Sequence, residues 1–323
     1  MAGKNACVCR RFEGRRSSVS QPKILVTGSD LAQPAINILS DFELVFAGKA
    51  PSEDDLIGLC ETHQPIAIIV RYGKITSKVI DVCTNLKVIS KHGSGIDTID
   101  VKTAEQKGIA VKAAVGANAN AVAEHAWALI LACAKDVVYL NDRMQQGYWD
   151  KSTHKTLELK GKTLGLIGFG SIGRRTAEIA AVFGMDVLAY DPFASECPEH
   201  VTLTDLESIY TTSDVISLHC PLTEENRELI NKDVLEKLKP GVILVNTARG
   251  GLIDEEALIE KVRSGTMGTV ALDSFHSEPL EGEHKFSGLE GIILSPHIGG
   301  VTGDAYVNMG VGAARNILSS LAS

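Results

Sequence analysis

The stretch Thr163-Leu-Gly-Leu-Ile-Gly168-Phe-Gly170-Ser-Ile-Gly173 decides the fold, because an apolar strand runs directly into the pattern G-x-G-x-x-G. Helix-forming sequence follows from Arg174 to Phe183, and the next apolar run, Val187-Leu-Ala-Tyr190, ends at Asp191. Glycine triplets also occur in turns that bind no ligand, and the strand, the helix and the acid distinguish this one from them. Together these features predict a turn that holds phosphates at the start of a helix.

The three glycines and the acid have separate roles in such a turn. Gly168 permits the tight turn, Gly170 lets the backbone approach a pyrophosphate, and Gly173 lets helix and strand pack closely. The carboxylate of Asp191 would accept a hydrogen bond from a ribose 2′-hydroxyl and would repel a 2′-phosphate. The predicted cofactor is therefore NAD rather than NADP.

Length and charge limit the classes of protein to consider. A chain of 323 residues is long enough for two domains. Its net charge of −8 argues against general nucleic-acid binding. No apolar run reaches the roughly 18 residues that a membrane span needs. We therefore expect neither nucleic acid nor a membrane among its partners.

The cysteines indicate a reducing compartment. There are seven, an odd number, and they are scattered without a C-x-x-C pair. This pattern is typical of reduced thiols in a cytoplasmic protein. Cys7 and Cys9 could contact a metal, but no partner cluster lies near them in the sequence, so we predict no metal site.

The first 20 residues differ in composition from the rest. Lys4 and four arginines are set against a single acid, Glu13, and no apolar segment of a secretory signal is present. One interpretation is an organelle transit peptide, which is typically rich in arginine and serine. The other, which we favour, is a basic extension at residues 1–20 that is disordered or results from an upstream start codon.

Two series of alternating strand and helix follow this segment. Apolar runs predict the strands of the first series at residues 22–28, 44–46, 67–70, 86–89 and 109–111. Helical spacing lies between them at residues 32–39, 53–60 and 78–83. A long alanine-rich stretch without proline or glycine, from Asn118 to Gln146, then predicts a helix.

The second series begins at Lys162. Its predicted strands are residues 163–167, 187–190, 215–218, 242–245, 270–272 and 292–294. Helical segments lie between them, for example at residues 232–238 and 255–262. The last segment, Gly303 to Leu321, predicts a helix that is too short to stand alone and returns to pack on the first series.

This alternation is typical of α/β folds in which helices cover both faces of a parallel sheet. We therefore predict two doubly wound domains. A Rossmann NAD-binding domain at residues 118–300 is inserted in a flavodoxin-like substrate-binding domain at residues 21–117 and 301–323. Ligands bind outside the carboxyl ends of such strands, so the predicted site is the cleft between the domains.

Three side chains at the ends of predicted strands suit one reaction. Arg249, between a strand and two glycines, can hold a carboxylate or carbonyl oxygen in a fork of hydrogen bonds. An imidazole can take up and release a proton near neutral pH, so a histidine at position 297 fits a general base, and Glu278 can orient its ring. Each alone could be a surface or structural residue, but beside a nucleotide site they favour hydride transfer to or from a 2-hydroxy acid.

These motifs resemble the D-isomer-specific 2-hydroxyacid dehydrogenase family, especially its phosphoglycerate dehydrogenase branch, from about Pro22 to Leu321. The resemblance implies that Arg249, Glu278 and His297 form a catalytic triad. It also implies a homodimer with the long helix after Asn118 near the interface. The implied contacts to NAD lie in the glycine turn and at strand ends: Ser171, Ile172, Asp191, Cys220, Pro221, Thr247, Ala248, Asp273, Gly299 and Gly300.

A second glycine-rich loop, Lys91-His-Gly93-Ser94-Gly95-Ile-Asp97, resembles the substrate loop of the family. Backbone N–H groups in such a loop can form an anion nest, although a plain strand-to-helix turn would have the same composition. Arg71, after the strand at residues 67–70, and Lys91 are the candidates for gripping a phosphate.

Two departures from the family pattern leave the triad untouched. Ser274 stands where an aliphatic residue is usual, and Asn226 where a threonine is usual. We expect no regulatory serine-binding domain after Ser323, and hence no feedback by serine through one.

The leading functional hypothesis is an NAD-dependent dehydrogenase that converts 3-phosphoglycerate to 3-phosphohydroxypyruvate, as in serine biosynthesis. The alternative enzyme is a hydroxypyruvate or glyoxylate reductase. A hypothesis from another class is an NAD-sensing binding protein similar to the transcriptional corepressors of this superfamily, which keep the same triad.

Overall fold

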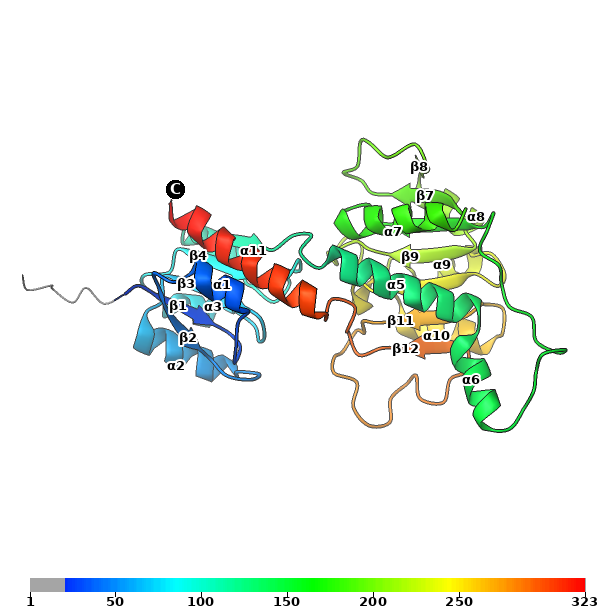
Figure 1. Cartoon of the computed structure of the whole chain (residues 1–323), viewed down its shortest axis with the longest axis horizontal. Helices are drawn as coiled ribbons and strands as arrows, with labels where there is room; N and C mark the ends of the chain where they lie inside the picture. Colours follow the sequence, from blue (N-terminus) through cyan, green and yellow to red (C-terminus); the bar gives the residue numbers. More distant parts are fainter. Residues whose placement is uncertain (1–20, 323) are drawn as a thin grey trace, which may run out of the picture.

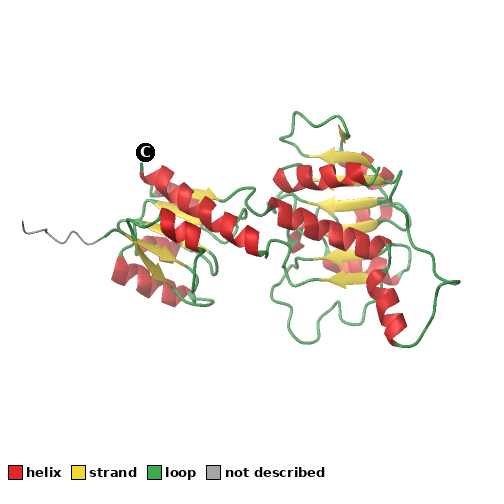
Figure 2. Ribbon diagram, in the orientation of Figure 1, coloured by secondary structure: helices red, strands yellow, loops and turns green. Residues whose placement is uncertain are grey.

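The computed structural model describes residues 21–322 and shows two lobes (Figure 1). Each lobe is built on one parallel sheet, and helices cover both faces of each sheet (Figure 2). Both faces carry a buried apolar cluster, which explains why the strands read as continuous apolar runs. The interpretations of the basic segment 1–20 and of Cys7 and Cys9 lie outside the described residues.

The first lobe has a five-stranded sheet with the order β2-β1-β3-β4-β5, which is the flavodoxin-like order. Its strands are β1 Lys23–Val26, β2 Glu43–Phe46, β3 Ala67–Val70, β4 Val88–Lys91 and β5 Ala110–Ala113. Its helices are α1 Gln33–Ile38, α2 Glu53–His63, α3 Ser77–Asp81 and α4 Val101–Gln106, and α11 Gly303–Leu321 packs against α1, β4 and β5.

The second lobe has a seven-stranded sheet with the order β12-β11-β10-β9-β6-β7-β8, a Rossmann order extended by one strand. The strands are β6 Thr163–Ile167, β7 Asp186–Tyr190, β8 Val201–Leu203, β9 Val215–Leu218, β10 Ile243–Asn246, β11 Val270–Leu272 and β12 Ile292–Leu294. The helices are α5 Ala119–Ala134, α6 Val137–Gln145, α7 Ser171–Val182, α8 Leu206–Thr212, α9 Lys232–Lys237 and α10 Glu255–Arg263, with a 3₁₀ turn η1 at Gly250–Leu252. The predicted fold class, a Rossmann lobe inserted in a flavodoxin-like lobe, is confirmed.

The chain crosses between the lobes before α5 and again before α11 (Figure 1). α5 belongs to the second lobe because it packs on α7, β10 and β11. The indole of Trp127 stacks on Phe183 at 4.7 Å, and its Nε1 donates a 3.0 Å hydrogen bond to the carbonyl of Thr176. This packing holds the first helix of the insertion firmly on the Rossmann sheet.

The single helix predicted from Asn118 to Gln146 is wrong, because the structure has two helices, α5 and α6, separated at Lys135 and Asp136. Asp136 adopts a left-handed conformation with φ of 48°, which ends α5 and starts α6 in a new direction. Its carboxylate pairs at 2.8 Å with Nε2 of His154, far along the chain. That long-range pair stabilises a break which no proline or glycine signals in the sequence.

The edge strand β8 was not predicted, and α4, α8 and the turn η1 were not singled out in the sequence. The strand β8 has only three residues, of which Val201 alone is fully buried, so its sequence lacks a strong apolar run. None of the helices in residues 21–322 combines the length and apolar character of a membrane span.

Candidate active site

The glycine turn lies between β6 and α7, and two of its glycines have no room for a side chain. A β-carbon at Gly168, whose φ is +98°, would lie 2.5 Å from the backbone nitrogen of Cys220. A β-carbon at Gly173 would lie 2.2 Å from the carbonyl oxygen of Gly168. The first glycine therefore allows the turn to touch the β9 loop, and the third allows α7 to pack on the end of β6.

Gly170 differs, because open space faces it. A β-carbon there would meet no atom within 4 Å, and Gly170 is the N-cap of the 12-residue helix α7, with Ser171 and Ile172 in its first turn. Free space in front of a helix N-terminus is what a pyrophosphate requires, since the N–H groups and the helix dipole attract an anion there. The turn thus fits the dinucleotide that its sequence predicts.

Asp191, at the carboxyl end of β7, lies against this turn. Its Oδ2 accepts a 2.8 Å hydrogen bond from the N–H of Phe169, and its Oδ1 accepts one of 2.9 Å from the N–H of Phe193. Each oxygen keeps a further lone pair for a ligand hydroxyl. The position and the remaining acceptors fit a ribose of NAD.

Two asparagines brace the neighbouring loops that carry the other predicted NAD contacts. Nδ2 of Asn226 donates to the carbonyl of Pro221 at 2.7 Å, within the loop that holds Cys220. Burial raises the pKa of the Cys220 thiol to about 11, so this group is neutral. After β10, the buried Asn246 accepts from the N–H of Ala248 and fixes the segment that starts at Thr247.

Arg249 extends from that braced segment toward the first lobe. Nδ2 of Asn246 donates to the carbonyl of Arg249 at 2.9 Å, which fixes its backbone. Its guanidinium donates through Nη1 to the carbonyl of Ala248 at 2.7 Å and through Nη2 to Oδ1 of Asp97 at 2.9 Å. The arginine therefore bridges the two lobes, a contact that the sequence did not predict.

Glu278 and His297 meet although 19 positions separate them. Oε2 of Glu278 lies 2.7 Å from Nδ1 of His297, and Oε1 accepts a 2.8 Å hydrogen bond from the N–H of Phe275. Because Nδ1 is engaged, Nε2 is the nitrogen left to exchange a proton with a substrate. The side chains of His297 and Glu278 are 44% and 34% exposed, so the pair is open to solvent.

The backbone of His297 is strained, with φ of +52°. A left-handed conformation costs a non-glycine residue roughly 1–2 kcal/mol. Such strain persists where surrounding contacts impose it, and it is concentrated at functional sites.

Asp273 supplies those contacts from beneath. Its side chain is 2% exposed. It accepts hydrogen bonds from Ser295 Oγ at 2.6 Å and from the N–H groups of Ile298 and Gly299 at 2.9 Å each. Nε2 of His125, on α5, lies 3.2 Å from the same carboxylate. The structure thus places Asp273, predicted as an NAD contact, under the loop that carries His297.

Two further glycines complete this region. A β-carbon at Gly299 would lie 3.0 Å from Oδ2 of Asp273, and one at Gly300 would lie 2.8 Å from Nδ2 of Asn118. Sequence reasoning missed His125 and Asn246. Both could have been found in the sequence as polar residues among apolar ones. His125 lies in an alanine-rich helix, and Asn246 lies at the end of a buried strand.

The predicted substrate loop follows β4 and lies against Arg249. A β-carbon at Gly95 would lie 1.9 Å from Nη2 of Arg249, so the guanidinium passes directly over this glycine. Ser94 Oγ donates to Oδ1 of Asn118 at 3.2 Å, and Gly93 precedes it in a positive-φ conformation. Lys91 contacts Thr98 at 3.3 Å, and burial lowers the pKa of its ammonium.

Arg71 lies in a different cluster at the carboxyl end of β3. Its guanidinium pairs with the carboxylate of Asp30 and lies 4.9 Å from the ring centre of Tyr306 on α11. Only 10% of its side chain is exposed. The structure therefore brings Lys91, Gly95 and Arg249 together, whereas Arg71 is engaged by its own acid.

Comparison with known proteins agrees with the predicted NAD-binding fold and class of enzyme. Residues 127–299 match the family model described as "D-isomer specific 2-hydroxyacid dehydrogenase, NAD binding domain". The chain is similar to a hydroxypyruvate reductase of Thermotoga maritima, with 45% identity over 286 residues that cover 88% of this chain and 93% of that protein.

The chain is also similar to a longer relative and to a solved structure. The chain is 38% identical over 304 residues to a D-3-phosphoglycerate dehydrogenase of Synechocystis sp., covering 93% of this chain and 54% of that protein. It thus spans about half the length of that relative. The crystal structure of a 3-phosphoglycerate dehydrogenase of Entamoeba histolytica with bound NAD⁺ superposes with a TM-score of 0.79 at 30% identity, covering 94% and 96% of the two chains.

Proposed function

Because this chain belongs to the D-isomer-specific 2-hydroxyacid dehydrogenase family, we propose that its cleft interconverts a short 2-hydroxy acid and the matching 2-oxo acid. The family confirms the resemblance inferred from the motifs, the class of enzyme and NAD as the cofactor. The roles of individual residues and the identity of the acid are our proposals. The observation that carries the reaction is the 2.7 Å pair between Glu278 and His297 at the edge where Arg249 enters the cleft.

Each residue of the triad has one task. NAD, when bound, accepts the hydride in oxidation and returns it in reduction. Nε2 of His297 takes the substrate hydroxyl proton in oxidation, and the carboxylate of Glu278 stabilises the imidazolium that results. The donors of Arg249 that remain free hold the substrate carboxylate and polarise the carbonyl oxygen in reduction.

We further propose that the physiological acid is unphosphorylated, in the class of hydroxypyruvate or glyoxylate. Both arginines at the carboxyl edge of the sheets are paired with carboxylates, Arg249 with Asp97 and Arg71 with Asp30. A phosphorylated acid brings a second anionic group, and among Arg71, Lys91 and Arg249 only Lys91 forms no ion pair. A relative of matching length and 45% identity that is named hydroxypyruvate reductase supports this substrate class.

A second candidate substrate is 3-phosphoglycerate, which the sequence had favoured. The observation for it is Lys91, a buried ammonium beside the substrate loop, together with relatives named D-3-phosphoglycerate dehydrogenase. Under this alternative, Lys91 grips the phosphate and Arg71 exchanges Asp30 for it.

Steady-state kinetics with NADH separate these candidates. We expect kcat/KM for hydroxypyruvate or glyoxylate to exceed that for 3-phosphohydroxypyruvate by at least about tenfold, which is 1.4 kcal/mol of discrimination. The opposite preference, with turnover of 3-phosphoglycerate by NAD, would establish the second candidate. Tight NAD binding without turnover of any of these acids would instead support an NAD-sensing binding protein.

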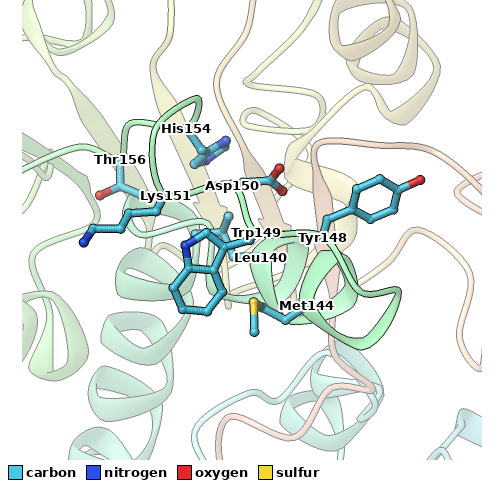
Figure 3. Close-up of a pocket in the computed structure, with 8 residues that line it drawn as sticks. All are labelled: Leu140, Met144, Tyr148, Trp149, Asp150, Lys151, His154 and Thr156. Carbon is cyan, nitrogen blue, oxygen red and sulfur yellow. The ribbon is translucent and has the colours of Figure 1, made fainter.

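We also propose that the protein is a homodimer that uses the surface formed by α6 and residues 148–156. Large apolar side chains are exposed there, with Trp149 at 74%, Val137 at 54% and Met144 at 52%. Figure 3 shows Trp149 and Met144 around one hollow of this surface. Several exposed apolar side chains on one surface are typical of a binding face, and a second copy of the chain is the partner that we propose.

The cysteines support a proposed cytoplasmic location. The cysteines in the part of the chain that the structure describes are free thiols. Free, mostly buried thiols are typical of a reducing compartment. Cell fractionation with an antibody against the chain would test this location.

A further inference from the structure

We propose that Glu255, the first residue of α10, positions Glu278 and through it His297. Glu255 holds the peptide between Phe275 and His276, and the backbone of Phe275 orients Glu278. The inference rests on the proposed function of the cleft, and it adds to the triad a positioning residue that acts through Glu278.

Two neighbouring N–H groups of the loop after β11 donate to two different carboxylates. The N–H of Phe275 donates to Oε1 of Glu278 at 2.8 Å, and the N–H of His276 donates to Oε1 of Glu255 at 2.7 Å. Oε2 of Glu278 in turn lies 2.7 Å from Nδ1 of His297. Glu255 is therefore connected to the imidazole of His297 through the backbone of Phe275 and the side chain of Glu278.

The peptide between Phe275 and His276 is also closely packed. A β-carbon at Gly250 would lie 1.9 Å from the carbonyl carbon of Phe275 and 2.3 Å from the nitrogen of His276. The ring of Phe275 lies 5.7 Å from that of Phe286, and both rings are buried. These contacts limit how far the peptide can move, and the hydrogen bond to Glu255 fixes the direction of its N–H group.

The burial of Glu255 distinguishes it from an acid that merely interacts with the helix dipole. Glu255 and Glu256 both lie in the first turn of α10, where negative charge is favourable. The side chain of Glu256 is 75% exposed, whereas that of Glu255 is 4% exposed. A buried carboxylate is costly unless partners compensate it.

Those partners both belong to the loop that carries Glu278. Oε1 of Glu255 accepts from the N–H of His276, and its Oε2 lies 2.7 Å from Nζ of Lys285. His276 and Lys285 precede and follow Glu278 in the segment between β11 and β12. The buried acid therefore ties α10 to the loop on both sides of Glu278.

Loss of the Glu255 carboxylate would release the peptide that orients Glu278. The N–H of His276 would lose its acceptor, and a shift of the Phe275 backbone would lengthen the 2.8 Å bond to Glu278. A misplacement of catalytic groups by about 1 Å can cost about 10²-fold in rate. The position of Glu255 should therefore be visible in the chemical step.

Steady-state kinetics with NADH and hydroxypyruvate provide the first test. Glu255→Ala should lower kcat by about 10- to 100-fold. KM for hydroxypyruvate should stay within about threefold of the wild type, because Arg249 keeps its contacts with Asn246 and Asp97. Glu256→Ala is the matched control: it removes an acid of the same helical turn that also pairs with Lys285, and it should leave kcat unchanged.

A double variant separates the hydrogen bond from the ion pair. Glu255→Gln combined with Lys285→Met keeps an oxygen that can accept from His276 and removes both charges. We expect it to recover kcat to within about threefold of the wild type. A double variant as slow as Glu255→Ala would overturn the role of this hydrogen bond. If urea denaturation shows that Glu255→Ala does not fold, Glu255→Asp, which is one methylene shorter, replaces it and should also lower kcat.

The side chain of His297 gives a readout that does not depend on turnover. In protein with ¹³C-labelled histidine, the NMR signal of His297 is the one that His297→Asn lacks. The pH at which this signal lies halfway between its two limits should be lower in Glu255→Ala by roughly half to one pH unit, because the imidazolium has lost part of its carboxylate partner. Glu256→Ala and the double variant should follow the wild type.

The outcomes separate this inference from the proposed function. Wild-type kcat in Glu255→Ala, or a His297 signal that titrates as in the wild type, overturns the positioning role. A wild type that turns over no 2-oxo acid overturns the proposed function instead, and the His297 signal still tests Glu255.

Discussion

At the scale of single residues, the site depends on carboxylates that orient other groups. Glu278 holds Nδ1 of His297, Asp273 ties down the loop beneath it, and Asp191 accepts two N–H groups beside the glycine turn. In each case both oxygens of the acid are engaged. Those of Glu278 contact His297 and the N–H of Phe275, whereas Asp191 and Asp273 accept from N–H groups of the loops beside the site. This arrangement leaves little rotational freedom in the groups that would contact NAD or the substrate.

The role of His297 is open to a direct test. His297→Asn should lower kcat by roughly 10²- to 10⁴-fold, because no group remains to take or return the hydroxyl proton. The dissociation constant for NADH, measured by fluorescence, should stay within about twofold of the wild type. His200→Asn, an exposed histidine of the same lobe, is the matched control. A His297→Asn variant with wild-type kcat would remove this residue from the base role.

Asp191 makes a prediction about the choice of cofactor. Asp191→Ala should weaken NAD binding and reduce discrimination against NADP, because the acceptor for the ribose hydroxyl and the charge that repels a 2′-phosphate are both lost. The measurement is the ratio of kcat/KM with NADH and NADPH. Asp186→Ala, an exposed acid at the opposite end of β7, should leave that ratio unchanged. An unaltered ratio in Asp191→Ala would contradict the ribose assignment.

At the scale of elements, close packing of α7 on β6 makes Gly173 costly to replace. Gly173→Ala places a β-carbon 2.2 Å from the carbonyl oxygen of Gly168, so helix and strand must separate. We expect a loss of roughly 1–3 kcal/mol in the free energy of unfolding. Gly58→Ala, inside α2 with nothing within 4 Å, should instead gain up to about 1 kcal/mol. Urea denaturation checks both, and a stabilised Gly173→Ala would contradict the tight contact.

The surface of α6 and residues 148–156 makes a prediction about assembly. Trp149→Glu places a charge among the exposed apolar side chains and should convert a dimer to a monomer, measured by light scattering after gel filtration. Val182→Glu, which changes an 87% exposed apolar residue on α7, should leave the mass unchanged. If Trp149→Glu and the wild type have the same dimer mass, the interface lies elsewhere.

Elements with strong local signals were predicted well. The predicted bounds of β3, β6, β9, β11, β12 and α11 agree with the structure, because continuous apolar runs or a clear helical pattern fix them. The division of α5 from α6 was not predicted, since Asp136 takes its left-handed conformation through a pair with His154. The edge strand β8 was missed because a strand with one paired neighbour needs few apolar residues.

At the scale of the whole molecule, parallel topology explains why separate motifs could be combined into one site. Arg249, Glu278 and His297 follow β10, β11 and β12, which are neighbours in the sheet, so their carboxyl ends meet at one edge. The contact of Arg249 with Asp97 could not be predicted in this way, because 152 positions separate the two residues and the contact depends on how the lobes face each other. The engagement of Arg71 by Asp30 and Tyr306 was also missed, because it joins residues that are far apart in the sequence but lie in one lobe, to which α11 returns at the end of the chain.

That return of α11 leads to a prediction about stability in acid. His92, at the end of β4, is 9% exposed, and its ring lies 5.5 Å from that of Tyr306 on α11. Burial, followed by the charge of Arg71, lowers the pKa of His92 to about 4. In the unfolded chain this histidine has a pKa of about 6.5. Between these values the unfolded state binds more protons than the folded state, so stability falls as the pH decreases.

The expected loss is about 1 kcal/mol per pH unit between pH 6 and pH 5, in addition to the contributions of other groups. His92→Gln, which stays neutral, should reduce the decrease in urea midpoint over this interval, whereas His200→Gln, at an exposed position, should follow the wild type. Because His92 packs against Tyr306 of α11, its protonation should first weaken the packing of α11 on the first lobe. Hydrogen exchange would then increase in α11 before it increases in the Rossmann lobe. If the urea midpoints of His92→Gln and the wild type fall equally between pH 6 and pH 5, this histidine does not govern the acid sensitivity of the fold.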